Sequence, residues 1–223
     1  MKVIARDGVW APSYFKTAIS HCIEADNLLG KVLATDELPK HVMIDERINE
    51  AGTIVIVFSA MCIEAYLNDY LAQKMGESMF YKHYERKSSA EKLILALGSE
   101  NLQGKENVEL EVKNLFIERN SLVHAKSHDI SYESNVDERK IPTNDNEQDI
   151  IKTTYFQDYC IEYTKRANRA VCAVLLLGEY MQRKEPSFRT DVSLLGLNAI
   201  PRPSMEIIKK IENLCGTLGI GLP

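Results

Sequence analysis

Residues 156–181 read FQDYCIEYTKRANRAVCAVLLLGEYM, and the spacing of their apolar side chains decides the fold class. The apolar positions recur in alternating steps of four and three: Phe156, Cys160, Tyr163, Ala167, Ala170, Val174, Leu177 and Met181. Such a stripe is typical of a helix that packs against other helices at a shallow crossing angle. We predict one long helix near Lys152–Lys184, which Pro186 would end.

The remaining sequence also predicts helices, because the strand-like alternation of polar and apolar residues is almost absent. We expect one helix near Tyr14–Ala34, with Ser13 as its N-cap. A longer helix is expected near Asp45–Lys74, after a loop that contains Pro39. Gly76 should mark the end of this longer helix, since glycine is common directly after a helix.

Two shorter helices complete the predicted bundle. Ser88 and Glu91 have the spacing of a capping box, and Gly98 should close the helix that follows them. The next helix is expected near Glu106–Lys126, before the polar segment Ser127–Asp149. The sequence therefore predicts an all-α fold, an antiparallel helical bundle of four to five main helices with a C-terminal extension.

The chain is expected to have two parts. Residues 1–186 would form the bundle, and residues 187–223 would form a C-terminal arm. The arm contains the apolar patch Val192–Leu197 and a short helical pattern, so we expect it to pack on the bundle or on a partner subunit.

The composition is that of a globular protein, with 45% hydrophobic and 26% charged residues among 223. The net charge of −5 argues against a protein that coats nucleic acid, although a small basic cleft on an acidic body is compatible with an RNA substrate. No signal peptide is visible, and the longest apolar runs, Ile54–Ile63 and Ala170–Leu177, are short for a bilayer span. We therefore expect a cytoplasmic protein without membrane contact.

Cysteine usage and motifs give no sign of a metal or cofactor. The five cysteines are odd in number and no two have CxxC spacing, so we predict reduced thiols and no zinc site. The sequence contains no glycine-rich loop for nucleoside triphosphates or dinucleotides and no HExxH. We expect no cofactor and no metal.

The stretch that carries chemistry is ERNSLVH, residues 118–124. It places Arg119, Asn120 and His124 near the end of an amphipathic helix. Arginine offers a fixed positive fork to a phosphate, and histidine transfers protons near neutral pH. Together these side chains are able to act on a phosphodiester without a metal.

The helical wheel places Arg119 in an unusual position. At about 100° per residue, Arg119 falls in the middle of an apolar stripe, so it is either satisfied by a buried partner or lines a cleft. Asn120 and His124 lie one turn apart on the adjoining shoulder and could face one site. The structural alternative is a buried ion pair for Arg119 and a helix-dipole contact for His124. The stripe consists of Val108, Val112, Leu115, Leu122 and Val123.

An upstream helix offers a partner for this arginine. Val57, Met61, Glu64 and Asn68 step by four, three and four along one face. A carboxylate and an amide at core-facing positions need partners, and Glu64 could pair with Arg119 and orient its guanidinium. A purely structural polar layer is the alternative.

These residues resemble the HEPN superfamily (higher eukaryotes and prokaryotes nucleotide-binding domain). Its members have an antiparallel helical bundle and an arginine that precedes a histidine by four to six intervening residues. Here Arg119 and His124 have four residues between them, and Asn120 supplies the usual polar residue after the arginine. The segment FSAMCIEAYLN, residues 58–68, is similar to the acidic helix of several HEPN groups. The resemblance covers roughly Tyr14–Lys184.

The resemblance implies metal-independent RNA cleavage by a homodimer, in which two motif helices share one cleft at a two-fold axis. Arg119 and His124 would be catalytic, with Asn120, Glu64 and Asn68 in support. His124 would take the proton from a ribose 2'-hydroxyl or protonate the leaving 5'-oxygen. Arg119 would stabilise the charge on the phosphorane.

Lys126 and His128 follow the motif and would add weak RNA-binding potential at the cleft mouth. Some toxin members carry a tyrosine where this chain has Lys126, so regulation through a modified tyrosine is not supported. The implied role is a toxin or an antiphage defence component, with an antitoxin as a further partner. Two alternatives stay open: a non-catalytic HEPN interaction or nucleotide-binding module, and a helical scaffold without a ligand.

Overall fold

The computed structural model describes residues 10–34, 38–100, 102–123 and 145–185, together with positions 213 and 216. The side chains of residues 38–43 and 145–156 lie outside this description. The described ranges contain helices and no strand, which confirms the all-α fold. The helices are α1 (Trp10–Leu33), α2 (Leu38–Met75), α3 (Glu77–His83), α4 (Ser89–Leu97), α5 (Lys105–Val123) and α6 (Asp145–Lys184).

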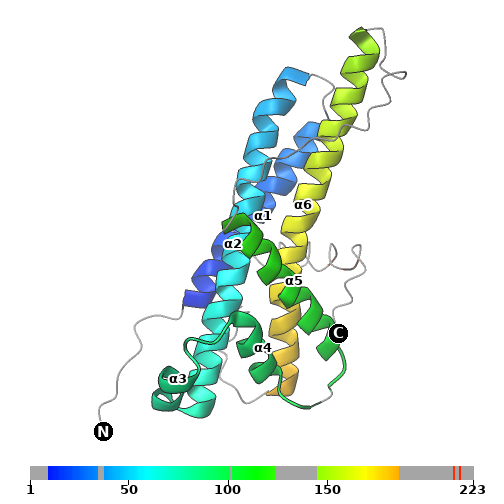
Figure 1. Cartoon of the computed structure of the whole chain (residues 1–223). Coiled ribbons are helices and arrows are strands. Elements are labelled where there is room, and N and C mark those ends of the chain that lie inside the picture. Colours follow the sequence, from blue (N-terminus) through cyan, green and yellow to red (C-terminus); the bar gives the residue numbers. More distant parts are fainter. Residues whose placement is uncertain are drawn as a thin grey trace.

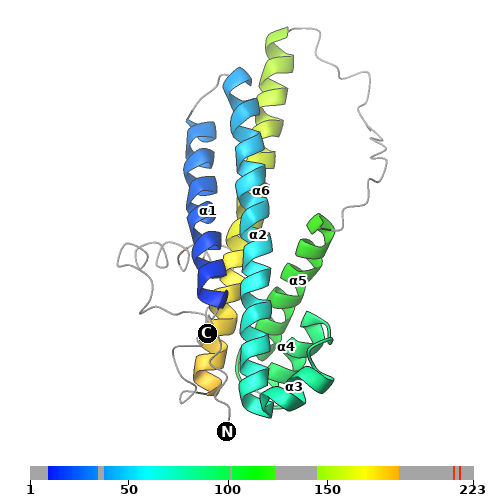
Figure 2. The same cartoon turned by 90° about the vertical axis from the view of Figure 1, so that its left-hand side faces the viewer.

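Three long helices, α1, α2 and α6, form the body of the molecule (Figures 1 and 2). α1 runs antiparallel to α2, whereas α6 runs alongside them in the direction of α2. α3 and α4 lie at the end of the bundle where α2 ends, and α5 crosses α2 and α6 on one side. α5 packs against α2, α4 and α6 at once, so it connects α4 to the long helices α2 and α6.

The helices begin earlier than the sequence predicts. α1 starts at Trp10, so Ser13 lies inside it and is not its N-cap. α2 starts at Leu38, and Pro39 lies in its first turn, a position that proline tolerates because the N–H has no partner there. α6 starts at Asp145, so the polar segment that the sequence predicts extends too far. Gly76, with a φ of 86°, follows α2 directly, as expected.

The seam of α6 forms the core, as its spacing predicts. Every described member is buried, because α6 packs on α1 and α2 along its length and on α5 beside them. Full burial of a large apolar side chain stabilises a fold by about 1.5–3 kcal/mol. The buried members are Cys160, Tyr163, Ala167, Ala170, Val174, Leu177 and Met181, while the side chain of Phe156 lies outside the description.

α2 is the central helix and contacts α1, α3, α4, α5 and α6. Its segment Ile44–Met75 is long and apolar enough to cross a membrane, judged by length and composition, and 56% of the most apolar window is buried inside the bundle. A core helix covered by its neighbours has the same composition. The pattern of α2 alone therefore does not decide where the protein resides.

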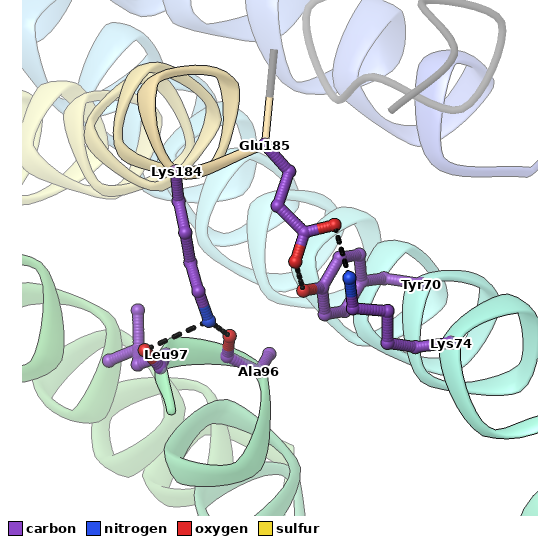
Figure 3. A network of polar contacts seen from close by, with 6 residues as sticks. All are labelled: Tyr70, Lys74, Ala96, Leu97, Lys184 and Glu185. Carbon is purple, nitrogen blue, oxygen red and sulfur yellow. Dashed lines mark hydrogen bonds and ion pairs between the residues drawn. The ribbon is translucent and has the colours of Figure 1, made fainter. Parts of the chain in front are cut away.

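α4 is fixed at both of its ends. At its start, the Ser88 hydroxyl accepts a hydrogen bond from the Glu91 backbone and the Glu91 carboxylate accepts one from the Ser88 backbone, which confirms the capping box. At its end, the Lys184 ammonium of α6 donates to the carbonyls of Ala96 and Leu97, at 2.6 and 3.0 Å (Figure 3). These bonds satisfy carbonyls that a helix end leaves free.

Glu185 continues the network at the end of α6 (Figure 3). Its two carboxylate oxygens accept hydrogen bonds from the Tyr70 hydroxyl and the Lys74 ammonium of α2, both at 2.7 Å. Burial opposes the charge, but the bonds from Lys74 and Tyr70 hold the pKa of Glu185 below its ordinary value. Together with the Lys184 contacts, they tie α2, α4 and α6 to one another.

Cysteine chemistry departs from the prediction at one position. Cys22, Cys62 and Cys160 are buried free thiols, as expected. Cys172 of α6 is disulfide-bonded, and its partner lies outside the described residues. The prediction of reduced thiols is wrong for Cys172, so cysteine usage no longer argues for a reducing compartment.

Candidate functional site

Ion pairs hold α5 against α6. Glu111 of α5 is 5% exposed and accepts two hydrogen bonds from the Arg169 guanidinium, both at 2.7 Å. Glu118, two turns along α5, pairs with Arg166 of α6. The bonds to Glu111 raise the pKa of Arg169 above its ordinary value. α5 is therefore a rather polar helix whose attachment to α6 depends on charge as well as on apolar packing.

Arg119 lies on the inner side of α5, as the wheel predicts. Val108, Val112 and Leu115 of the same stripe are buried. Leu122 is partly buried and packs against the core, whereas Val123 is 51% exposed, so the stripe ends one residue earlier than predicted. The Arg119 side chain itself is 29% exposed, which places a cation at the boundary between core and solvent.

The contacts of Arg119 leave part of its guanidinium available. Nη2 lies 3.9 Å from Oε2 of Glu64 on α2, so the predicted pairing of these two residues is present as a long ion pair. Nη1 donates to Oδ1 of Asn120 at 3.0 Å. Nε is buried and has no hydrogen-bond partner among the described residues. The other oxygen of Glu64 accepts a hydrogen bond from the Ser89 hydroxyl of α4 at 2.8 Å.

An open pocket of about 280 Å³ lies beside Arg119, between the start of α4 and the facing part of α5. The α5 wall of the pocket mixes the polar Lys113 and Asn120 with the apolar Phe116 and Ile117, and the Lys113 ammonium also contacts Glu109 at 2.6 Å. The lining residues are Ser88, Ser89, Ala90, Lys113, Phe116, Ile117, Arg119 and Asn120.

The start of α4 adds positive potential to this pocket. Its first backbone N–H groups carry the positive end of the helix dipole. Lys92, in the second turn of α4, is buried, and burial lowers its pKa, while the nearby Glu64 acts in the opposite direction. The pocket is therefore lined by Arg119, Lys113 and the start of α4, which offer donors to an anion, although Lys92 does not line it and Glu64, Glu91 and Glu109 lie next to these groups.

Of the other predicted site residues, Asn68 is described by the structure and the three that follow Val123 are not. Asn68 lies one turn after Glu64 on α2, and its side-chain oxygen is buried without a hydrogen-bond partner in the part of the chain that is described. α5 is described up to Val123, so His124, Lys126 and His128 lie outside the described residues. The structure therefore brings together Arg119, Glu64 and Asn120, and it leaves the histidine of the motif untested.

The sequence did not point to Ser89, Lys92 or Lys113 as neighbours of this site. The capping box located the start of α4, but the packing of that start against Glu64 depends on the tertiary fold. Lys113 lies six residues before Arg119 on α5, and the wheel puts the two about 120° apart, so spacing alone did not assign them to one site.

The outer face of α5 also exposes apolar side chains. Leu110 is 55% exposed and Ile117 is 68% exposed, and their seven-residue spacing puts both on one face of α5. Val123, a member of the inner stripe, is exposed at the end of the helix but lies on a different face. Leu110 and Ile117 are two turns apart on one face and are available for contact with another protein.

Two further observations bear on the chemistry of the site. No group of three or more histidine, cysteine, aspartate or glutamate side chains able to hold a metal ion occurs in the described ranges. No known family, curated protein or solved structure matches the chain.

Proposed function

We propose that the chain is a metal-independent endoribonuclease of the HEPN type, which cleaves RNA by attack of a ribose 2'-hydroxyl on the adjacent phosphate. One observation carries the proposal: Arg119, on an otherwise apolar side of α5, borders an open pocket and keeps 29% of its side chain exposed. A cation placed there for stability alone would be expected to lie closed against its acid.

The geometry around Arg119 supports phosphate binding. A close arginine–carboxylate pair has contacts of about 2.7–2.9 Å, so the 3.9 Å approach of Glu64 leaves donor capacity on the guanidinium. Asn120 takes up only one of the five N–H groups. A phosphate in the pocket would find the remaining donors, with the Lys113 ammonium and the start of α4 close by.

In the proposed reaction, His124 takes the proton from the 2'-hydroxyl, and the 2'-oxygen attacks phosphorus. Arg119 stabilises the negative charge that builds on the phosphorane, and Asn120 orients the guanidinium. A proton is then delivered to the leaving 5'-oxygen. The products are a 2',3'-cyclic phosphate and a 5'-hydroxyl, and no metal takes part in any step.

A homodimer is part of the proposal. The exposed Leu110 and Ile117 on the outer face of α5 support a contact between two such helices, because burying them would stabilise the assembly. The resemblance implies that two α5 helices share one cleft. The arginine of one subunit and the histidine of the other would then act on the same phosphate.

The test is an RNA cleavage assay with purified protein in excess EDTA. We expect the wild-type protein to produce fragments with cyclic phosphate ends, and the Arg119→Ala and His124→Ala proteins to produce none while remaining folded dimers. Arg47→Ala, which removes an exposed arginine of α2 paired with Glu24, is the matched control and should cleave normally. Full activity of the His124→Ala protein would exclude the mechanism.

A non-catalytic HEPN interaction or nucleotide-binding module is the second candidate. The contacts of Arg119 with both Glu64 and Asn120 favour it, because they show that the arginine also has a structural use. This candidate predicts a stable dimer without cleavage in the same assay. A toxin or defence role with an antitoxin partner belongs to the first candidate, and it predicts growth arrest on expression that the Arg119→Ala substitution relieves.

A further inference from the structure

The carboxylate of Glu64 is divided between two neighbours. Oε1 accepts a hydrogen bond from the Ser89 hydroxyl at 2.8 Å, and Oε2 lies 3.9 Å from Nη2 of Arg119. A carboxylate with both oxygens free would face an arginine in the bidentate geometry, which gives two short contacts. The bond from Ser89 therefore fixes the position of Oε1, and the Glu64 carboxylate would have to turn against this bond to form a closed pair with Arg119.

The same molecule contains the closed arrangement for comparison. Glu111 meets Arg169 through both oxygens, at 2.7 Å each, and no serine hydroxyl is bonded to Glu111 among the described contacts. Both pairs join α5 to a long helix, and they differ in what else the carboxylate touches. The longer distance between Arg119 and Glu64 thus occurs in the pair whose carboxylate also accepts a hydrogen bond from Ser89.

Ser89 is held where it can act in this way. It is the first residue of α4, directly after the N-cap Ser88, and α4 buries Leu93, Ala96 and Leu97 in the core. The far end of α4 is attached to α6 by the Lys184 ammonium (Figure 3). A helix fixed at both ends is able to hold one hydroxyl against a carboxylate of another helix.

We infer that Ser89 is a positioning residue: it holds the Glu64 carboxylate so that the Arg119 guanidinium stays open to a phosphate in the neighbouring pocket. Without the hydroxyl, Glu64 turns to pair with Arg119 through both oxygens, and the guanidinium is closed to an anion. The inference rests on the proposed function for its effect on cleavage, but its effect on anion binding by Arg119 is independent of cleavage.

The experiment compares Ser89→Ala with Ser89→Thr in the full chain. Ser89→Ala should lower kcat/KM for RNA about tenfold, the size of effect that one hydrogen bond to a charged group is able to produce. Ser89→Thr keeps the hydroxyl and should restore most of the lost rate. Ser20→Ala, which removes a hydroxyl from an exposed site on α1, controls for the loss of a serine and should change nothing.

A double-mutant cycle separates positioning from loss of structure. If Ser89 acts through Glu64, Ser89→Ala should have no further effect on kcat/KM in a Glu64→Gln protein. An equal tenfold loss in both backgrounds would show that Ser89 acts on something else and would overturn the inference. Thermal unfolding of each variant shows whether α4 stays in place.

A second readout needs no cleavage. The Nε–H resonance of Arg119, assigned through the Arg119→Ala protein, is followed by NMR during titration with inorganic phosphate. We expect Ser89→Ala to weaken the phosphate-dependent shift about tenfold and Ser89→Thr to keep it, as for the rate. If the wild-type protein does not cleave RNA, the proposed function fails, and this titration alone decides the inference. Equal phosphate affinities of wild-type and Ser89→Ala proteins would overturn it.

Discussion

Three arginine–glutamate pairs among the described residues fasten α5 to the long helices, and two of them are built differently. Arg169 and Glu111 meet through two 2.7 Å contacts with the acid almost fully buried. Arg119 and Glu64 approach to 3.9 Å beside an open pocket, with the acid shared with Ser89. The first pair has the geometry of a structural clamp, whereas the second leaves a cation with unused donors. Under the proposed function, the closed pair serves the fold, whereas the open pair leaves an arginine for a phosphate.

The largest effect is expected for Arg119→Lys, which keeps the charge but removes the planar fork. The rate of RNA cleavage should fall about a hundredfold or more, because a lysine reproduces neither the geometry nor the number of donors. The free energy of unfolding should change by less than about 1 kcal/mol, since the pair with Glu64 is long and partly exposed. Cleavage rates and urea unfolding of the same preparation would check both parts. A lysine protein with full activity would show that a point charge is sufficient.

Arg169→Ala should give the opposite result. Glu111 would keep a nearly buried carboxylate without its two hydrogen bonds, which should cost about 3 kcal/mol of unfolding free energy. This free-energy cost lies at the low end of the range for breaking a buried ion pair, because the Arg169 side chain is half exposed. Cleavage by the fraction that remains folded should be unchanged. Urea unfolding measures the loss, and a drop below 1 kcal/mol would show that water replaces the arginine.

The two arginine–glutamate pairs show which contacts can be predicted from sequence spacing and which cannot. The wheel placed Arg119 in an apolar stripe, and steps of four, three and four placed Glu64 on the core-facing side of its helix, so spacing within two helices made Glu64 a candidate partner of Arg119. The prediction could not include Ser89, because its contact with Glu64 depends on how α4 packs on α2. For the same reason the Glu111–Arg169 pair was not foreseen, since the sequence does not give the crossing of α5 over α6.

The ends of the elements show a similar division. Ser88 and Glu91 fixed the start of α4 because a capping box is local chemistry within one turn. Pro39 was placed in a loop although proline is favoured in the first turn of a helix, so the sequence contained the signal and its interpretation was wrong. The exposure of Val123 could not be derived from its stripe, because a stripe does not tell where the neighbouring helices stop.

Ser88→Ala tests whether the long Arg119–Glu64 pair depends on a well-ordered first turn of α4. Loss of the N-cap hydroxyl should reduce the free energy of unfolding by about 1 kcal/mol. Because Ser89 follows directly, loosening of this turn should also lower the cleavage rate, though by less than Ser89→Ala does. Thermal unfolding and cleavage assays measure the two effects. A larger rate loss in Ser88→Ala than in Ser89→Ala would make the whole turn, rather than one hydroxyl, responsible.

Glu185 provides the smallest effect and a third carboxylate for the comparison. Both of its oxygens are occupied, by Tyr70 and Lys74 at 2.7 Å, so it resembles Glu111 rather than Glu64. Its pKa is lowered from the ordinary value of 4.5 because the bonds from Lys74 and Tyr70 outweigh the effect of burial. A carboxyl whose pKa is lower in the folded state stabilises the fold above the unfolded-state pKa, and this contribution is lost as the pH falls through the folded-state pKa. Between neutral pH and pH 3, the wild-type protein should therefore lose more unfolding free energy than Glu185→Gln does, since glutamine does not titrate. Urea unfolding of both proteins across this pH range gives the difference, and parallel curves would mean that the closed contacts of Glu185 contribute no charge-dependent stability.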